Sequence, residues 1–410
     1  MLQSSILFSL IWAILATALK KRESTQNGFH WLCRALWSSQ VQEVKSRMPQ
    51  TPDIKGFERL AHIVAIMGGA ILFGFLAMLL NFPLPWMLGA LVFAGTVRLL
   101  DFPVRIPVQT RQLGQILVAS SVGLSFTPEA LQLMGALALP MVLAAVLTIL
   151  LSFGVATVLM KLTHVGAGTA ILATLPMGPV ESAVLAQKHG VAPGPIVFGQ
   201  TMRIVFLVIL IPPLIVLLDG SVADPVGVLR DMDWTGTGAA LLFAFGLAGA
   251  VVLKLIRMSN PFFLGALAGA ALASVFGLPV SSYPYIVLVS AQIFLGIWLG
   301  AVIDRDLFRN ARGFLPGSIL TSIIMIVLCA VMGMGLTWMT GQPWQVMVLA
   351  AAPGSVTEMA LTAKILQEGL AVVTAFHIVR IFIILPFSGI IVAQALRLAK
   401  IFQGSKPTLQ

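Results

Sequence analysis

The chain has 410 residues, of which 58 % are hydrophobic and only 10 % are charged, and its mean hydropathy is +0.99. Soluble domains carry about a quarter charged residues, so this deficit of charge excludes a soluble protein and predicts an integral membrane protein. The net charge of +10 would also suit a nucleic-acid partner. The basic residues instead lie in short loops beside apolar runs, and no DNA-binding motif is visible, so no direct contact with nucleic acid is expected.

The first 55 residues form an extension that precedes the rest of the pattern. Residues 2–19 are apolar over about the length of a membrane span. Basic residues follow this run rather than precede it, which argues against a cleaved signal peptide. Residues 29–48 have the spacing of an amphipathic helix on the membrane surface. A start of translation at Met48 is the alternative interpretation of this region.

The remainder of the chain contains two sets of six apolar segments, which predict an all-α membrane protein. The second and third segment of each set are short. The first set lies near 60–81, 85–100, 113–126, 131–160, 166–186 and 196–218, and the second near 235–256, 261–276, 285–303, 315–339, 346–364 and 371–398.

The fifth segment of each set is interrupted by residues that break helices. The breaks are formed by Pro176, Gly178 and Pro179 in the first half and by Pro353 and Gly354 in the second. Proline removes a backbone donor, and a broken backbone inside a membrane must be covered by protein or line a water-filled cavity. Each fifth segment is therefore predicted to be a re-entrant hairpin or an unwound helix.

The two halves are repeats of one another at an offset of 177 residues. This offset relates Pro176 to Pro353 and Glu181 to Glu358. It also relates Gln115 to Gln292, Gly123 to Gly300 and Arg203 to Arg380. A duplicated membrane segment that keeps a Glu and an Arg in each copy predicts a transporter-like core.

The distribution of basic residues predicts how the repeats cross the membrane. If each half crosses five times and the second half is inverted, one side receives most of the basic loop residues. These are Arg98, Arg105, Arg111, Lys161, Lys188, Lys254, Arg257, Arg305, Arg309, Arg312, Arg397, Lys400 and Lys406. The sequence thus predicts inverted repeats at 57–218 and 235–398, an acidic periplasmic linker at 219–234, and a cytoplasmic tail at 399–410.

Two arginines inside apolar segments are the strongest candidates for a functional site. A charge at this depth costs about 2.5–3.5 kcal/mol and must face a partner or water. One interpretation is that Arg203 and Arg380 form internal ion pairs with Glu181 and Glu358. The other is that the arginines bind an anionic substrate, because a guanidinium donates two parallel hydrogen bonds to a carboxylate or phosphate.

The neighbours of these charges complete the candidate site. Gln200 and His377 each precede an arginine by three residues, which places them on the same helix face and makes them candidate substrate ligands. Glu181 and Glu358 would carry a coupling proton or Na⁺, with oxygen ligands from Ser355 and Thr357. The alternative for these hydroxyls is that they satisfy the broken backbone. The glycines after Gln115 and Gln292, which include Gly123 and Gly300, are expected to allow close helix packing.

The motifs PWMLGAL and PFFLGAL, the paired GQ segments, PMGPVES and PGSVTEM, and the terminal H-x-x-R together resemble the AbrB-type membrane proteins of Gram-negative bacteria. The resemblance covers about residues 57–398. It implies an internal duplication, an inner-membrane location and a relationship to ion-coupled transporters. Members are also labelled as transition-state regulators or ammonia monooxygenases, but this chain has no DNA-binding element and no cluster of copper or iron ligands.

These observations predict an ion-coupled secondary transporter of a small metabolite that is expected to be anionic. Its environment is the lipid bilayer, and a homodimer is expected by analogy. The alternative is a membrane sensor that affects gene expression indirectly. The sequence contains no nucleophile elbow, metal-ligand spacing or phosphate loop, so neither an enzymatic activity nor a cofactor or metal is expected.

Overall fold

The computed structural model describes residues 56–82, 84–219, 230, 232–256, 258, 260–303 and 313–404. The predictions for residues 1–55, most of the acidic linker and the last six residues lie outside these ranges. The chain divides into two compact units, residues 1–61 and residues 62–410. Only the start of one helix is described in the first unit, and all that follows concerns the second.

The described residues are helical and contain no strand, which confirms the predicted all-α class. The helices of the first half are α3 (Gly56–Leu79), α4 (Pro85–Leu99), α5 (Val108–Gly123), α6 (Pro128–Ala136), α7 (Ala138–Thr163), α8 (Ala167–Thr174), α9 (Pro179–Lys188) and α10 (Pro193–Asp219). Those of the second half are α12 (Gly236–Leu255), α13 (Pro261–Val275), α14 (Tyr285–Ala301), α16 (Leu315–Thr340), α17 (Trp344–Ala351), α18 (Val356–Ile365) and α19 (Leu370–Gly404).

The sequence repeat is also a repeat of helices. The starts of α5 and α14, of α7 and α16, and of α8 and α17 are each 177 positions apart, as are those of α9 and α18 and of α10 and α19. The starts of α4 and α13 are 176 positions apart. Both of these helices follow a residue in the left-handed region, Leu84 (φ 59°) and Asn260 (φ 53°). The duplication therefore extends to the conformation of single residues.

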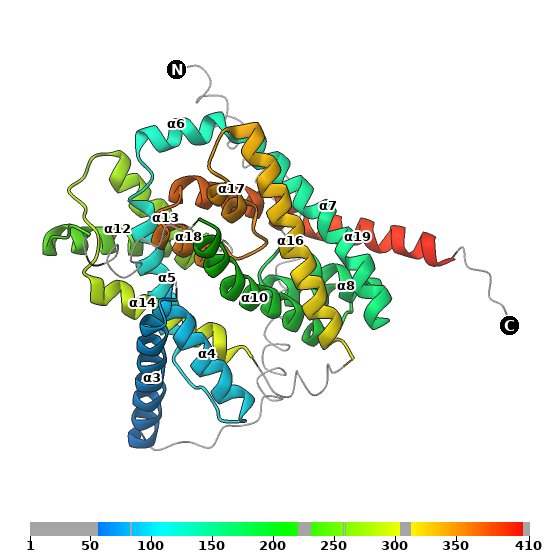
Figure 1. The fold of residues 1–410 in the computed structure, drawn as a ribbon, viewed down its shortest axis with the longest axis horizontal. Coiled ribbons are helices and arrows are strands. Elements are labelled where there is room, and N and C mark those ends of the chain that lie inside the picture. The colour runs from blue at the N-terminus through cyan, green and yellow to red at the C-terminus, as the bar shows by residue number, and fades with distance from the viewer. Residues whose placement is uncertain are drawn as a thin grey trace, which may run out of the picture. The chain divides into compact units, whose positions relative to one another are not determined.

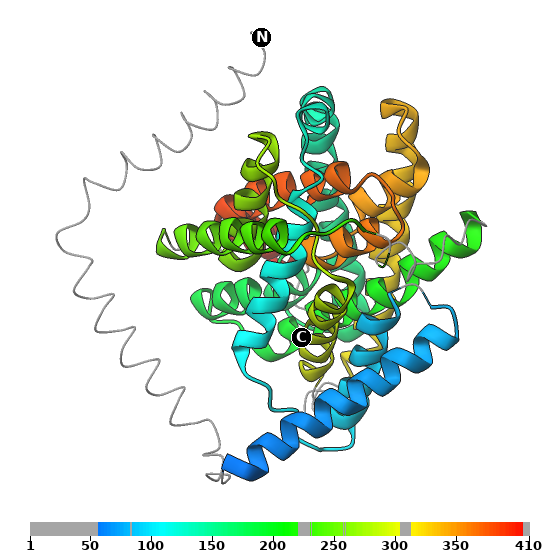
Figure 2. The ribbon, with the colours of Figure 1, turned by 90° about the vertical axis from the view of Figure 1, so that its left-hand side faces the viewer.

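The two halves interlock rather than fold separately. Helix α4 packs on α14, and α5 packs on α13, so each pair joins one half to the other. Helices α7, α8, α10, α16, α17 and α19 form a second group in which α7 contacts both α16 and α19. Figure 1 shows α4, α5, α13 and α14 to the left of most of this second group. Figure 2 shows α3 along the outside of α4.

Five helices are long and apolar enough to cross a membrane, in the ranges Ala61–Leu79, Ala138–Thr163, Pro193–Leu218, Gly236–Leu255 and Leu315–Thr340. The second and third segments are short, as predicted, with helices of 15 to 17 residues. The chain is therefore a multi-pass membrane protein.

The predicted fourth segment, 131–160, differs from the structure in one respect. It is divided between α6 and α7, because Pro140 lacks the amide hydrogen that a continuous helix would need there. Proline is tolerated in the first turn of a new helix, and α7 accordingly starts at Ala138. Helix α6 instead follows α5 after a bend of 87°.

Close helix packing at the repeated glycines is confirmed. A Cβ atom added to Gly300 would lie 2.5 Å from the carbonyl oxygen of Leu91 on α4. A Cβ atom added to Gly123 would lie 2.5 Å from the Cβ of Ala270 on α13. Real Cβ atoms do not approach this closely, so the contacts between the halves require glycine at these positions.

Replacing Gly300 should therefore separate α14 from α4. We expect Gly300→Val to destabilise the protein by about 1–3 kcal/mol or more, because an overpacked interface must move its backbone. The measurement is the thermal unfolding midpoint of the purified protein in detergent. Gly154→Val is the matched control, since nothing lies within 4 Å of a Cβ at that position. Equal midpoints for the two variants would contradict the packing argument.

Candidate functional site

Both fifth segments are broken where the sequence predicts. Helix α8 ends at Thr174 and α9 begins at Pro179, while α17 ends at Ala351 and α18 begins at Val356. Leu175 and Ala352, the first residues after the ended helices, have extended conformations with ψ of 128° and 136°. Each break therefore exposes a helix C-terminus with free carbonyl oxygens and, a few residues later, a helix N-terminus with free amide groups.

The buried arginines bind the carbonyl oxygens at the breaks. Arg203 donates from Nη1 to Thr174 O at 2.9 Å and from Nη2 to Gln200 Oε1 at 2.5 Å. Arg380 donates from Nη1 to Ala352 O at 2.6 Å and from Nη2 to Gly354 O at 2.5 Å. A cation at a helix C-terminus satisfies these carbonyls and interacts favourably with the helix dipole. These guanidinium hydrogen bonds thus go to carbonyl oxygens of the broken backbone and, for Arg203, also to the Gln200 side chain.

Gln200 and His377 are fully buried, and each contacts a backbone carbonyl oxygen. Gln200 Nε2 donates to Leu172 O at 2.6 Å and to Leu175 O at 2.8 Å, while its Oε1 accepts from Arg203. His377 Nδ1 lies 2.9 Å from Val373 O. Neither side chain lines the large cavity described below. Gln200 thus ties α10 to the end of α8, whereas the contact of His377 lies within α19.

The two glutamates occupy the first turns of the helices that follow the breaks. Glu181 is the third residue of α9, and Glu358 is the third residue of α18. Ser355 caps α18, because its hydroxyl accepts a hydrogen bond from the Thr357 amide at 3.2 Å. A negative charge in this position is stabilised by the helix N-terminus. At the equivalent cap of α9, a Cβ on Gly178 would overlap the Glu181 carboxylate, so glycine leaves room for it.

A cavity of about 300 Å³ brings the two breaks together. Its lining includes most of the residues that the sequence singles out: Pro176, Gly178, Pro179, Glu181, Arg203, Gly354, Ser355, Thr357, Glu358 and Arg380. Pro353 is buried in its break but is not part of the lining. Residues 177 positions apart in the sequence thus face one shared space.

The opposite wall of this cavity comes from α5, α13 and α14, and sequence reasoning did not assign it to the site. It contains Arg111, whose guanidinium carbon lies 3.6 Å from the centre of the Trp298 ring. It also contains Gln115, which donates to Asn260 Oδ1 at 3.3 Å. The charge pattern of the sequence predicts Arg111 to be a loop cation, whereas in the structure it lies on α5. Its position four residues before Gln115, and hence on the same helix face, was the available signal.

Several polar atoms around the cavity are buried without a hydrogen-bond partner. They are Glu358 Oε2, Thr201 Oγ1 and the Nε atoms of Arg203 and Arg380. Unsatisfied buried polar atoms are costly and commonly mark sites of water, ions or function. The site can therefore offer donors to an anion and an acceptor to a cation or proton. The described residues contain no group of three or more His, Cys, Asp or Glu that could hold a metal ion.

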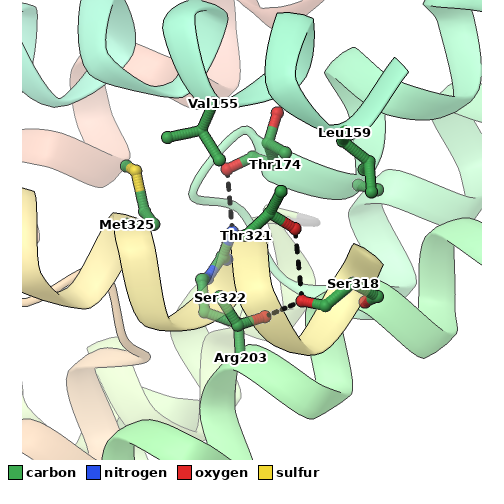
Figure 3. Close-up of a pocket in the computed structure, with 10 residues that line it drawn as sticks. Val155, Leu159, Thr174, Arg203, Ser318, Thr321, Ser322 and Met325 are labelled. Carbon is green, nitrogen blue, oxygen red and sulfur yellow. Dashed lines mark hydrogen bonds between the residues drawn. The ribbon is translucent and has the colours of Figure 1, made fainter. Parts of the chain in front are cut away.

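Arg203 also lines a second, much smaller cavity (Figure 3). Its volume is about 10 Å³, and hydroxyl groups of Thr174, Ser318, Thr321 and Ser322 lie around it. Such a space admits about one water molecule. The positions of α7 equivalent to Ser318, Thr321 and Ser322 are occupied by Met141, Ala144 and Ala145. The two repeats therefore differ in the polarity of the helix that packs behind each arginine.

The fold and this site define a multi-pass membrane protein whose two halves each contribute a broken helix to one polar cavity. The chain belongs to the family described as transition state regulatory protein AbrB, whose model matches residues 86–396. The match includes both breaks and every residue that lines the cavity. No curated protein and no solved structure matches the chain.

Removing either arginine should destabilise the break that it covers. We expect Arg203→Met and Arg380→Met each to lower the free energy of unfolding by about 1–3 kcal/mol, because carbonyl oxygens lose their donors in an apolar setting. Chemical or thermal unfolding in detergent measures the effect. Arg105→Met, at an exposed position before α5, serves as the control. Full stability of both buried variants would show that the breaks do not depend on these guanidiniums.

Proposed function

We propose that this protein is a secondary transporter of a small organic anion, coupled to H⁺ or Na⁺. The observation that carries the proposal is the cavity between the two breaks, with Arg111 on its wall. Among the described residues, the contact recorded for the Arg111 guanidinium is with the face of Trp298. A guanidinium held by stacking keeps its N–H edges available for a ligand.

The lining of the cavity suits an anion with an apolar body. The Arg111 edge matches the geometry of a carboxylate, to which arginine donates two parallel hydrogen bonds. Phe262, Leu295 and Ile384 add apolar surface to the same cavity. Small-molecule sites typically combine such a surface with a few polar groups that fix orientation. Arg203 and Arg380 would contribute their unpaired Nε atoms from the opposite side.

The glutamates provide the groups for ion coupling. Ionisable residues at membrane depth commonly form proton relays or ion sites. Glu358 Oε2 is buried without a partner, and the hydroxyls of Ser355 and Thr357 lie in the same helix start. A proton or Na⁺ bound there would neutralise the carboxylate and change the charge that the anion meets. Glu181 occupies the equivalent position in the other half of the site.

The topology that fits this function is a pair of inverted repeats. Each half would cross the membrane five times, with the fifth segment broken near the midplane, as in many secondary transporters. The bias of basic residues then places the C-terminus in the cytoplasm of a bacterium and the protein in the inner membrane. A homodimer remains part of this proposal by analogy alone.

A membrane sensor is the second candidate, and the regulatory description of the family favours it. Such a protein would bind the same ligand in the same cavity without moving it. Any effect on gene expression would be indirect. Binding experiments support both candidates equally, so flux must separate them.

A ligand screen tests the cavity. We expect at least one small carboxylate to raise the thermal unfolding midpoint of the purified protein, because a ligand of the folded state stabilises it by about 2.7 kcal/mol at 100 times its Kd. Arg111→Gln should abolish this shift, while Arg105→Gln should retain it. Acetate, lactate, succinate and phosphate, each with and without Na⁺, form the panel.

The uptake of the ligand that stabilises the protein is then measured in proteoliposomes that contain the protein. Accumulation driven by a pH or Na⁺ gradient supports transport, and binding without accumulation supports the sensor. A carboxylate that stabilises Arg111→Gln as well as the unmodified protein would remove Arg111 from the site.

Neutralising Glu358 should uncouple the ligand from the ion. In Glu358→Gln, we expect stabilisation by the carboxylate to become independent of Na⁺ and of pH between 6 and 8, since the amide can neither gain a proton nor carry the charge that holds Na⁺. The same melting experiment measures this. Retention of the full ion dependence would assign coupling elsewhere, with Glu181→Gln as the next variant.

A further inference from the structure

One buried cation near the cavity has no role in the site described above. Lys364 lies in the last turn of α18 and is only 6 % exposed. Its Nζ donates to the carbonyl oxygen of Ser121 at 3.2 Å and also to the Ser121 hydroxyl. Among the described residues, these are the hydrogen bonds of its ammonium group.

The partner of Lys364 is the C-terminal end of another helix. Ser121 is in the last turn of α5, where carbonyl oxygens have no donor within the helix. The amide of Ser125, four residues later, binds Val122 O instead. A positive charge at this end is favoured by the helix dipole. The protonated lysine therefore ties α18 to α5, two helices that lie side by side (Figure 1).

The surroundings of Lys364 contain more cations than carboxylates. Helix α18 packs against α5, α10, α17 and α19. Among the described side chains, the charged or titratable groups on these elements and next to them are Arg111 on α5, Arg203 on α10, Glu358 on α18, His377 and Arg380 on α19, and Glu368 in the turn after α18. Glu358 is six residues away, or about 9 Å along the helix axis.

The hydrogen bonds from the buried Lys364 ammonium group to one serine replace only part of the hydration that this group has in water. Burial penalises the charged form of an amine, and lysine is the cationic side chain that most readily responds by releasing its proton. A neutral amine keeps two weaker donors and no longer interacts with the helix dipole as a charge. Loss of this proton would therefore weaken the bond between α18 and α5.

The contact exists in only one half of the molecule. The residue equivalent to Lys364 is Gln187, which is exposed on α9. The residue equivalent to Ser121 is Trp298, which stacks on Arg111 at the wall of the cavity. Equivalent positions of the two repeats thus have different roles: Trp298 lines the cavity, whereas Ser121 binds Lys364. The lysine is therefore not a general requirement of the fold.

We propose that Lys364 is a proton-binding residue whose charged form fastens α18 to the end of α5 and whose neutral form releases it. Helix α18 starts in the cavity with Glu358 and ends at Lys364, so its release changes the position of the coupling carboxylate. This role in coupling rests on the proposed transport function. The proton-dependent contact itself does not, and it is testable without a ligand.

Hydrogen exchange of the full-length protein in lipid nanodiscs tests the contact. After correction for the intrinsic effect of pH, we expect amide exchange in residues 356–365 to be about tenfold faster at pH 9 than at pH 6, the scale of one charged hydrogen bond. Lys364→Met should show fast exchange at both pH values. Lys364→Arg should stay slow at both, because arginine keeps its charge.

Two further variants make the result specific. Ser121→Ala removes the hydroxyl acceptor and should weaken protection at pH 6 without changing it at pH 9. Gln187→Met, the equivalent change in the other repeat, should behave as the unmodified protein. A difference between the unmodified protein and Lys364→Met that is the same at both pH values would show a purely structural contact and overturn the proposal.

Failure of this proposal is distinguishable from failure of the transport assignment. If α18 responds to pH through Lys364 but no carboxylate binds, the proton-binding role of Lys364 is supported and the anion site at Arg111 is contradicted. If carboxylates bind through Arg111 and Lys364→Met changes nothing, the proton site falls alone. Should Lys364→Met fail to fold, the pH response of Ser121→Ala and Lys364→Arg still decides the question.

Discussion

The hydrogen-bonding demand of a broken helix in an apolar environment governs the arrangement of this protein. A helix that stops inside a membrane leaves carbonyl oxygens and amide groups that no water can satisfy. Here the carbonyl ends receive Arg203, Gln200 and Arg380, and the amide ends receive Ser355 and the glutamate charges. The broken backbone stabilises each of these charges, and the shared cavity lies between the two breaks and the wall formed by α5, α13 and α14.

The sequence predicts a large part of this arrangement, because the repeat and the breaks are local signals. Proline and glycine mark the interruptions, and the constant offset identifies the charged residues that belong together. The same signals predict the short helices and the close packing at Gly123 and Gly300, which depend on residue type alone. The separation of α6 from α7 is missed because hydropathy does not register the backbone donor that Pro140 lacks.

The residues that sequence reasoning misses depend on contacts between the two halves. Arg111 stacks on Trp298 at the wall of the cavity. Lys364 donates a hydrogen bond to Ser121, which lies more than two hundred positions earlier at the end of α5. No spacing along the chain encodes such a pairing. Sequence reasoning also treats the repeats as equivalent, whereas α16 carries hydroxyls behind Arg203 at positions where α7 carries Ala and Met. The positions at which the two repeats differ therefore indicate where the two halves have different roles.

The left-handed residues that precede α4 and α13 show that the two repeats keep one backbone conformation with unlike side chains. Asn260 suits this conformation and also accepts a hydrogen bond from Gln115, so backbone and side chain agree. Its counterpart Leu84 adopts the same conformation, which is unfavourable for its branched side chain. Gln292, the counterpart of Gln115, is buried with both amide atoms unpaired. The two copies thus hold the same path of the chain by different means: a hydrogen-bonded Asn260 in one and a fully buried Leu84 in the other. One backbone conformation can therefore be maintained by polar contacts in one repeat and by apolar packing in its counterpart.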